Sequence, residues 1–204
     1  MKLSLSELAV ERGEKTLFAP LTIHVESGTL VFVSGANGAG KTSLLRVLAG
    51  LGSASTGSVS WYNTHGEMSA SNAATFVGHA NAMNDALTVA ENLSYAASLS
   101  GLNGSEVYIR AALDAFRVAK LMRRRASTLS QGQRKRAALA RLLLSEAPGS
   151  RAWLLDEPFV ALDVDTQHLL ETLIAAELRA GAIVVLTSHQ AFDIDAPQRL
   201  EVAL

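Results

Sequence analysis

The stretch SGANGAGKTSLLRVLAG at 34–50 contains four glycines, three of which stand with a lysine between an apolar run and a helical pattern. Glycine weakens regular structure unless the backbone needs a conformation that other residues avoid. The preceding TLVFVSG is a short apolar run that predicts a buried strand. The following TSLLRVLAG has leucine and valine at helical spacing and ends on glycine. This order predicts a loop whose backbone N–H groups, with the helix N-terminus, bind an anion.

The same stretch matches the phosphate-loop pattern G-x-x-x-x-G-K-[ST]. Lys41 is expected to reach the β- and γ-phosphates of a nucleotide, and the Thr42 hydroxyl to be a Mg²⁺ ligand. The expected nucleotide-binding residues are Gly35, Ala36, Asn37, Gly38, Ala39, Gly40, Lys41, Thr42 and Ser43.

Composition excludes several other classes of protein. The net charge of −1 over 204 residues argues against nucleic acid as the main partner. The absence of cysteine excludes disulfide bonds, thiolate catalysis and covalent attachment of c-type haem. The N-terminal LSLSEL is no signal peptide, and the uncharged segment 47–66 is too polar to span a membrane. We expect a soluble chain that reaches a membrane through a partner.

The order of the predicted elements indicates an α/β fold. The first part of the chain is rich in strands and partly antiparallel, whereas 85–128 reads as two helices joined by a glycine-containing loop. The buried strands AWLLD and AIVVLTS then flank a helix at 166–180, which implies a parallel sheet. We predict a single domain over 1–204. In it, 1–84 and 129–204 form a nucleotide-binding core and 85–128 a helical subdomain.

Two adjacent carboxylates end the apolar strand AWLLD. Ligands of α/β proteins bind at the carboxyl ends of parallel strands, so Asp156 is expected to hold Mg²⁺, directly or through water. Glu157 is expected to orient or deprotonate an attacking water. The alternative is a solvated acidic turn. His189 follows the next buried strand, where it contacts a γ-phosphate or has a structural role.

The segment STLSQGQRKRAALARLLL predicts a helix with Ser130 as its N-cap and Gly132 open to close backbone approach. The cations Arg134, Lys135 and Arg136 in its first turns oppose the helix dipole, a conflict that a nearby anion relieves. A second anion site in a chain that already has a phosphate loop suggests a γ-phosphate held between two copies. The alternative is a solvated basic face.

The motifs GANGAGKT, LSQGQ, LLDEP, ALD and TSH together resemble ATP-binding cassette (ABC) subunits, in the same order and spacing and over essentially the whole chain. The resemblance implies an ATPase with ATP and Mg²⁺, and a P-loop NTPase fold with a RecA-like parallel sheet and an inserted helical subdomain. It also implies a head-to-tail homodimer, with Asp163 communicating across it. The residues facing the partner's ATP are then Ser130, Gln131, Gly132 and Gln133.

Within that family the chain is most similar to the branch that exports haem for cytochrome c biogenesis. The similarity lies in ERGEKTLF, FVGHANAMNDALTVAENL, LSQGQRKRAALARLLL and WLLDEPFVALD. It implies integral membrane subunits as partners, and a peripheral position on the cytoplasmic face of the bacterial inner membrane.

Three positions depart from the usual family pattern. His79 stands about twelve residues before the EN of LTVAEN, where most members have a glutamine that contacts Mg²⁺ and the membrane subunit. The resemblance therefore gives His79 a coupling role. Glu11 and Arg12 replace the aromatic residue that stacks on adenine, so Arg12 or Phe18 takes that place. Gln131 replaces a glycine of the signature, a change expected to leave the fold intact.

Other functions remain open at the level of the sequence. One is an ABC exporter of another substrate, such as a lipoprotein or a drug. Another is a soluble ABC protein of DNA repair or translation, although the chain has neither a long coiled coil nor a second cassette. A haem-binding module is a third, but the histidines are scattered singly. The run Arg123-Arg124-Arg125 is a solvated face or meets anionic lipid.

Overall fold

A five-stranded parallel sheet lies at the centre of the computed structural model, which describes residues 1–13, 15–144, 147 and 149–204. Each strand of this sheet pairs in parallel with its neighbours. The strands, in spatial order, are β11 (Gln198–Ala203), β5 (Thr29–Ser34), β10 (Val184–Thr187), β9 (Ala152–Asp156) and β8 (Ala74–Val77). The predicted parallel sheet is therefore confirmed. The sequence analysis did not predict the edge strands β8 and β11. β8 has only four residues and β11 is largely exposed, so neither has a clear hydrophobic pattern.

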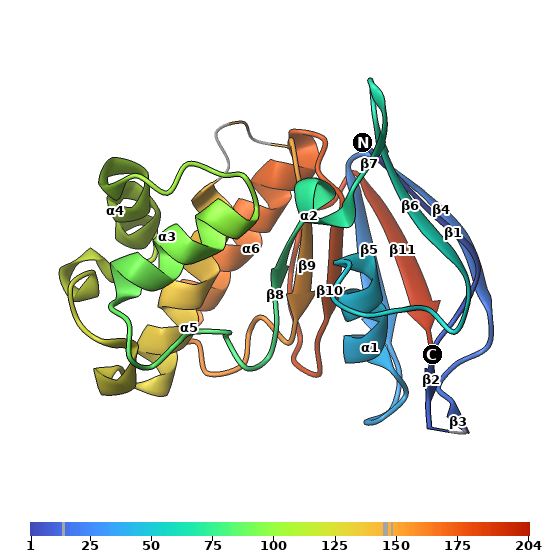
Figure 1. The fold of residues 1–204 in the computed structure, drawn as a ribbon, viewed down its shortest axis with the longest axis horizontal. Helices are drawn as coiled ribbons and strands as arrows, with labels where there is room; N and C mark the ends of the chain where they lie inside the picture. Colours follow the sequence, from blue (N-terminus) through green and yellow to red (C-terminus); the bar gives the residue numbers. More distant parts are fainter. Residues whose placement is uncertain (14, 145–146, 148) are drawn as a thin grey trace.

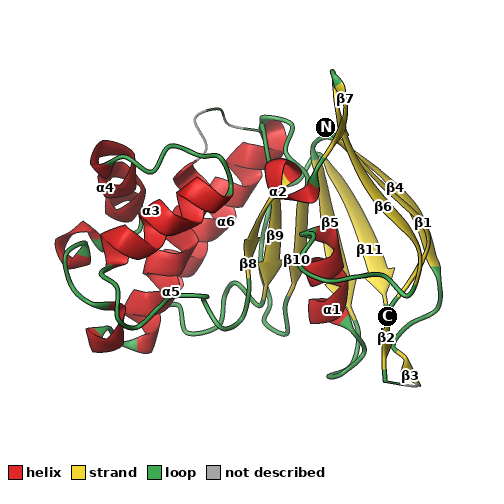
Figure 2. Cartoon of the chain, viewed as in Figure 1, coloured by secondary structure: helices red, strands yellow, loops and turns green. Residues whose placement is uncertain are grey.

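A second, antiparallel sheet is built from the first part of the chain, as predicted (Figure 2). Its strands, in spatial order, are β4 (Leu21–Glu26), β1 (Lys2–Ala9), β6 (Thr56–Asn63) and β7 (Gly66–Met68). In β4, Leu21, Ile23 and Val25 are more buried than the residues between them, as their alternation predicts. A small two-stranded ribbon of β2 (Glu11–Arg12) and β3 (Lys15–Thr16) extends from this region.

Helices cover both faces of the parallel sheet (Figure 1). Helix α1 (Lys41–Leu48) lies between the two sheets, and the short α2 (Ala70–Ala73) precedes β8. The remaining helices gather on the other face: α3 (Val89–Leu99), α4 (Glu106–Ala115), η1 (Ala119–Leu121), η2 (Ala126–Thr128), α5 (Gln131–Leu139), η3 (Ala140–Leu144) and α6 (Val164–Arg179). Two α-helices, α3 and α4, lie within 85–128 as expected, followed by the short 3-10 helices η1 and η2. The division into core and subdomain stays a prediction.

Alternate residues of the parallel strands feed two hydrophobic cores. Leu154 and Val185 pack with α1 and the antiparallel sheet, whereas their neighbours Leu155 and Leu186 pack with the larger group of helices. The buried Trp61 of β6 donates its indole N–H to the carbonyl of Leu48 at 2.9 Å. This bond fixes the C-terminal end of α1 against the antiparallel sheet, and so fixes the helix whose other end carries the phosphate loop.

Among the residues that the structure describes, no helix has both the length and the apolar character needed to cross a membrane.

Candidate functional site

The phosphate loop connects β5 to α1, and Gly40 stands at the N-cap of that helix with a φ of 106°. Two separate constraints, backbone conformation and steric clash, exclude a side chain at this position. The conformation is strained for any residue with a Cβ, and a Cβ here would lie 2.9 Å from both Leu17 Cβ and the Phe18 ring. Phe18 is thus buried beneath the loop. Phe18 is not among the residues that line the nucleotide hollow described below, so its burial gives no support to stacking on adenine.

Lys41 bends back over the loop that precedes it. Its ammonium donates hydrogen bonds to the carbonyl oxygens of Gly35 at 2.7 Å and Ala36 at 3.1 Å. The first backbone N–H groups of a helix have no partner within the helix. The ammonium and these N–H groups of α1 together give the loop a local positive potential, which suits a phosphate.

Asp156 joins the loop to the sheet. Its carboxylate, 3% exposed, accepts hydrogen bonds from the Thr42 hydroxyl at 2.8 Å and from the Thr187 hydroxyl at 3.0 Å. Thr42 belongs to α1, and Thr187 to β10, which pairs with β9. The predicted pair of Thr42 and Asp156 is therefore in direct contact. Thr187, fully buried at the end of its strand, is a site residue that the sequence analysis did not single out.

Glu157 follows with an unusual backbone, a φ of 50° that residues other than glycine seldom adopt. Its backbone N–H donates to the Thr187 hydroxyl at 3.0 Å, and its Oε2 accepts from the backbone N–H of His189 at 3.1 Å. The imidazole Nε2 of His189 lies 3.6 Å from Oε1. That Oε1 is buried and accepts no hydrogen bond within the described part of the chain, so its hydrogen-bonding capacity is unsatisfied.

These residues line one open hollow of about 480 Å³. The predicted residues Lys41, Thr42, Asp156, Glu157, His189 and His79 all face it, together with Asn37, Gly38, Gly40 and Ser43 of the loop. Arg12 and Lys15 form another part of its wall, with Leu17. Arg12 is therefore still available to stack on a base. Lys15 is a second cation that the sequence analysis did not single out.

The chemistry of the site fits Mg²⁺. This ion prefers oxygen ligands and usually takes only one or two from protein side chains, completing its shell with phosphate and water. The site offers the Thr42 hydroxyl and the Asp156 carboxylate at the edge of the hollow. Over the residues described, no cluster of three or more histidine, cysteine or carboxylate side chains offers an alternative metal cage.

The signature residues lie elsewhere in the same chain. Ser130 is the N-cap of α5 as predicted, and a capping box joins it to Gln133. Gln131 lines a separate hollow of about 370 Å³. His79 lies in the walls of both hollows. Asp163 caps α6 through Thr166, and hydrogen bonds from the side chain and backbone N–H of Thr166 lower the pKa of Asp163. None of the signature residues is brought to the phosphate loop within one chain.

A family model described as "ABC transporter" matches residues 18–160 and so spans the phosphate loop, the signature and the two carboxylates. The chain belongs to the ABC transporter family. It is an ATP-binding subunit of that family and an ATPase, as its motifs predict. The loop and the two carboxylates line one hollow, whereas Gln131 of the signature lines another.

Curated relatives match the cassette over nearly its whole length. The protein of Albidiferax ferrireducens named "Cytochrome c biogenesis ATP-binding export protein CcmA" is 44% identical over 197 residues, which cover 95% of this chain and 92% of that protein. The protein of the same name from Nitrosospira multiformis is 40% identical over 204 residues, covering 96% of each.

Solved structures share the fold. A putative ABC transporter ATP-binding protein from Pyrococcus furiosus superposes with a TM-score of 0.78 at 25% identity, over 98% of this chain and 97% of that one. An ATP-binding cassette solved as a dimer with ADP and Pi superposes with a TM-score of 0.76 at 22% identity. The superposition covers 92% of this chain and 88% of that one.

Two cations in the first turns of α5 are less exposed than the alternative of a solvated basic face requires. Arg134 is bound to the Asp85 carboxylate and the Ala126 carbonyl, and Lys135 is buried at 3% exposure. Neither cation is therefore part of a freely solvated face, and both line the hollow of about 370 Å³ beside Gln131. Burial lowers the pKa of Lys135 to about 8, although the charges of Asp156 and Glu157 oppose this shift.

We expect Lys41→Ala to reduce ATP hydrolysis by roughly 10² to 10³-fold, the usual effect of losing one donor to a developing charge. The fold should survive, because the Lys41 ammonium faces the hollow and not the core. Phosphate release and thermal melting measure the two effects. Lys2→Ala is the control, since Lys2 is an exposed partner of Glu26. Hydrolysis by Lys41→Ala at the wild-type rate would contradict the assignment of the loop.

Proposed function

We propose that the cassette supplies ATP binding and hydrolysis to a membrane complex that exports haem for cytochrome c maturation. The observation that carries this proposal is the match to relatives named for cytochrome c biogenesis export, at 40–44% identity over nearly the whole chain. Since any membrane role then depends on a partner, we place the cassette peripherally, on the cytoplasmic face of the bacterial inner membrane, bound to integral subunits.

In the proposed reaction, the phosphate loop and Lys41 hold the β- and γ-phosphates of ATP. Glu157 accepts a proton from a water that attacks the γ-phosphorus, and the bond to the β-phosphate oxygen breaks to give ADP and phosphate. The unsatisfied, buried Oε1 of Glu157 supports this role. His189, 3.6 Å from that oxygen, is placed to donate to the γ-phosphate. Mg²⁺, held by Thr42 and Asp156, would neutralise charge developing on the phosphates.

We infer further that the active unit is a head-to-tail dimer. The exposed N-terminus of α5, with Ser130 and Gln131, is open to another molecule, whereas the chain's own phosphate loop lies in a different hollow. Ser130, Gln131, Gly132 and Gln133 would then close over the partner's ATP. Asp163, already the cap of α6, would lie at the contact between the two copies.

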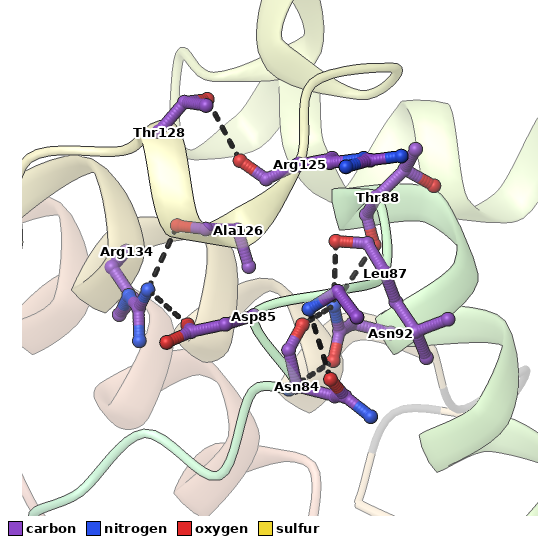
Figure 3. Close-up of polar contacts among 10 residues, drawn as sticks. Asn84, Asp85, Leu87, Thr88, Asn92, Arg125, Ala126, Thr128 and Arg134 are labelled. Atoms are coloured by element: carbon purple, nitrogen blue, oxygen red, sulfur yellow. Dashed lines mark hydrogen bonds and ion pairs between the residues drawn. The ribbon is translucent and has the colours of Figure 1, made fainter.

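His79 is the proposed link to the membrane subunit. It is exposed and lines both the nucleotide hollow and the hollow beside the signature. The segment that follows it is bound to the signature helix through Arg134, which donates to the Asp85 carboxylate (Figure 3). It is also bound to η3, which directly follows α5, because Arg141 of η3 donates to the Asn81 carbonyl. Movement of this segment by a membrane partner would therefore pull on the helix that carries the signature.

A third hollow lies close to His79 and offers a docking place for the membrane subunit. It measures about 330 Å³, is lined mainly by apolar side chains, and includes Phe76 and Ala82 on either side of the His79 turn. Leu51 and Leu99 in its wall are 64% and 66% exposed. We propose that an apolar segment of the membrane subunit binds here, beside the residue that senses nucleotide.

Glu157→Gln should stop turnover while ATP still binds, because the phosphate loop is unchanged. Losing general-base assistance costs a factor of about 10² to 10⁴, and the amide also removes a negative charge near the phosphates. The closed dimer should therefore accumulate: light scattering should give a dimer with ATP and a monomer without it. A variant that stays monomeric with saturating ATP, even with its membrane subunits present, would count against the composite site.

His79→Ala should leave ATP binding nearly intact, because the phosphate contacts come from the loop, but should uncouple hydrolysis from export. We expect loss of haem-stained c-type cytochromes in a bacterium that depends on this cassette for their maturation. His65→Ala, an equally exposed histidine in the turn between β6 and β7, is the matched control.

Normal maturation with His79→Ala would remove His79 from the coupling route. A haem content that is the same with and without the wild-type cassette would overturn the export proposal itself.

A further inference from the structure

A buried lysine connects the signature helix to the catalytic carboxylate within one chain. Lys135 lies on α5, five positions after Ser130, and is 3% exposed. Its ammonium donates a hydrogen bond to the backbone carbonyl of Glu157 at 3.0 Å. This contact crosses from the helix that presents the signature to the end of β9.

Stability alone gives no reason for a charge at this place. Removing an ammonium from water is costly, and an apolar side chain of similar volume usually serves the fold as well or better. The partners of Lys135 are the Glu157 carbonyl and the nearby charges of Asp156 and Glu157. All of them belong to the two residues that the proposed reaction uses, and this points to a role in that reaction.

The backbone of Glu157 needs such support. Its φ of 50° is unfavourable for a residue with a side chain, and the direction of its carboxylate depends on it. Thr187 holds its N–H, the His189 backbone holds Oε2, and Lys135 holds its carbonyl. Of these three contacts, the one from Lys135 comes from the signature helix.

We propose that Lys135 is a positioning residue for hydrolysis: it fixes the Glu157 peptide so that the carboxylate faces the attacking water. Because Ser130 caps the same helix, a shift of α5 on meeting the partner's ATP reaches the chain's own Glu157 through this bond. The signature of one site thus sets the alignment of the base in the other. This inference rests on the proposed role of Glu157.

The test compares Lys135→Met with Lys120→Met, a change of an exposed lysine. We expect Lys135→Met to lower kcat for ATP by up to about 10²-fold, the effect of misplacing a reacting group by about 1 Å. The KM and the dissociation constant for ATP should stay close to wild type, as should kcat of the control. An unchanged kcat in folded Lys135→Met would overturn the proposal. If that variant does not fold, Lys135→Leu, which also has no hydrogen-bond donor, replaces it with the same expectation.

A double variant separates positioning from general damage to the fold. If Lys135 acts through the Glu157 carboxylate, adding Lys135→Met to Glu157→Gln should reduce the residual kcat no further. A second, multiplicative loss would show that Lys135 acts elsewhere and would reject the inference. Failure of the proposed role of Glu157 looks different, because Glu157→Gln alone would then hydrolyse ATP at the wild-type rate.

Discussion

The site depends first on one buried carboxylate that holds three elements together. Asp156 ends β9 and accepts hydrogen bonds from Thr42 on α1 and Thr187 on β10, at 2.8 and 3.0 Å. The phosphate loop is thereby fixed against the carboxyl edge of the parallel sheet, where ligands of such folds bind. Thr187 in turn holds the backbone of Glu157. A change at Asp156 would therefore disturb the loop, the metal site and the proposed base together.

In the proposed dimer, one chain supplies only part of each hydrolysis site. The nucleotide hollow collects the phosphate loop, both carboxylates and His189, whereas Ser130 stands at the N-terminus of a helix outside it. The signature helix is nevertheless bound to the rest of its own chain through Arg134 and Lys135, and η3, which directly follows it, through Arg141. Because close-packed interiors have low compressibility, we expect helices held in this way to pass a displacement on to the elements that they contact. The proposed coupling between membrane partner, signature and base needs no contact beyond these three.

Much of this arrangement could be predicted from the sequence, because local patterns specify it. The glycine spacing gave the loop, the apolar run before Asp156 gave a strand and its end, and Ser130 was recognisable as a cap. What escaped prediction depends on contacts between distant segments. Nothing local marks Phe18 as the residue that packs under Gly40, or Lys135 as turned inward toward β9. The edge strand β8 escaped for the same reason, since four residues acquire strand structure only by pairing with β9.

We propose that Thr42 and Asp156 form the metal site of the ATP-binding loop. The decisive experiment is a crystal structure with a non-hydrolysable ATP analogue and Mn²⁺, whose anomalous scattering locates the metal. We predict a metal peak bound to the Thr42 hydroxyl and held by Asp156 directly or through one water. The hydrogen bond of 2.8 Å between these two side chains should be opened by the ion. An analogue seated in the loop with its metal away from both residues would contradict the claim.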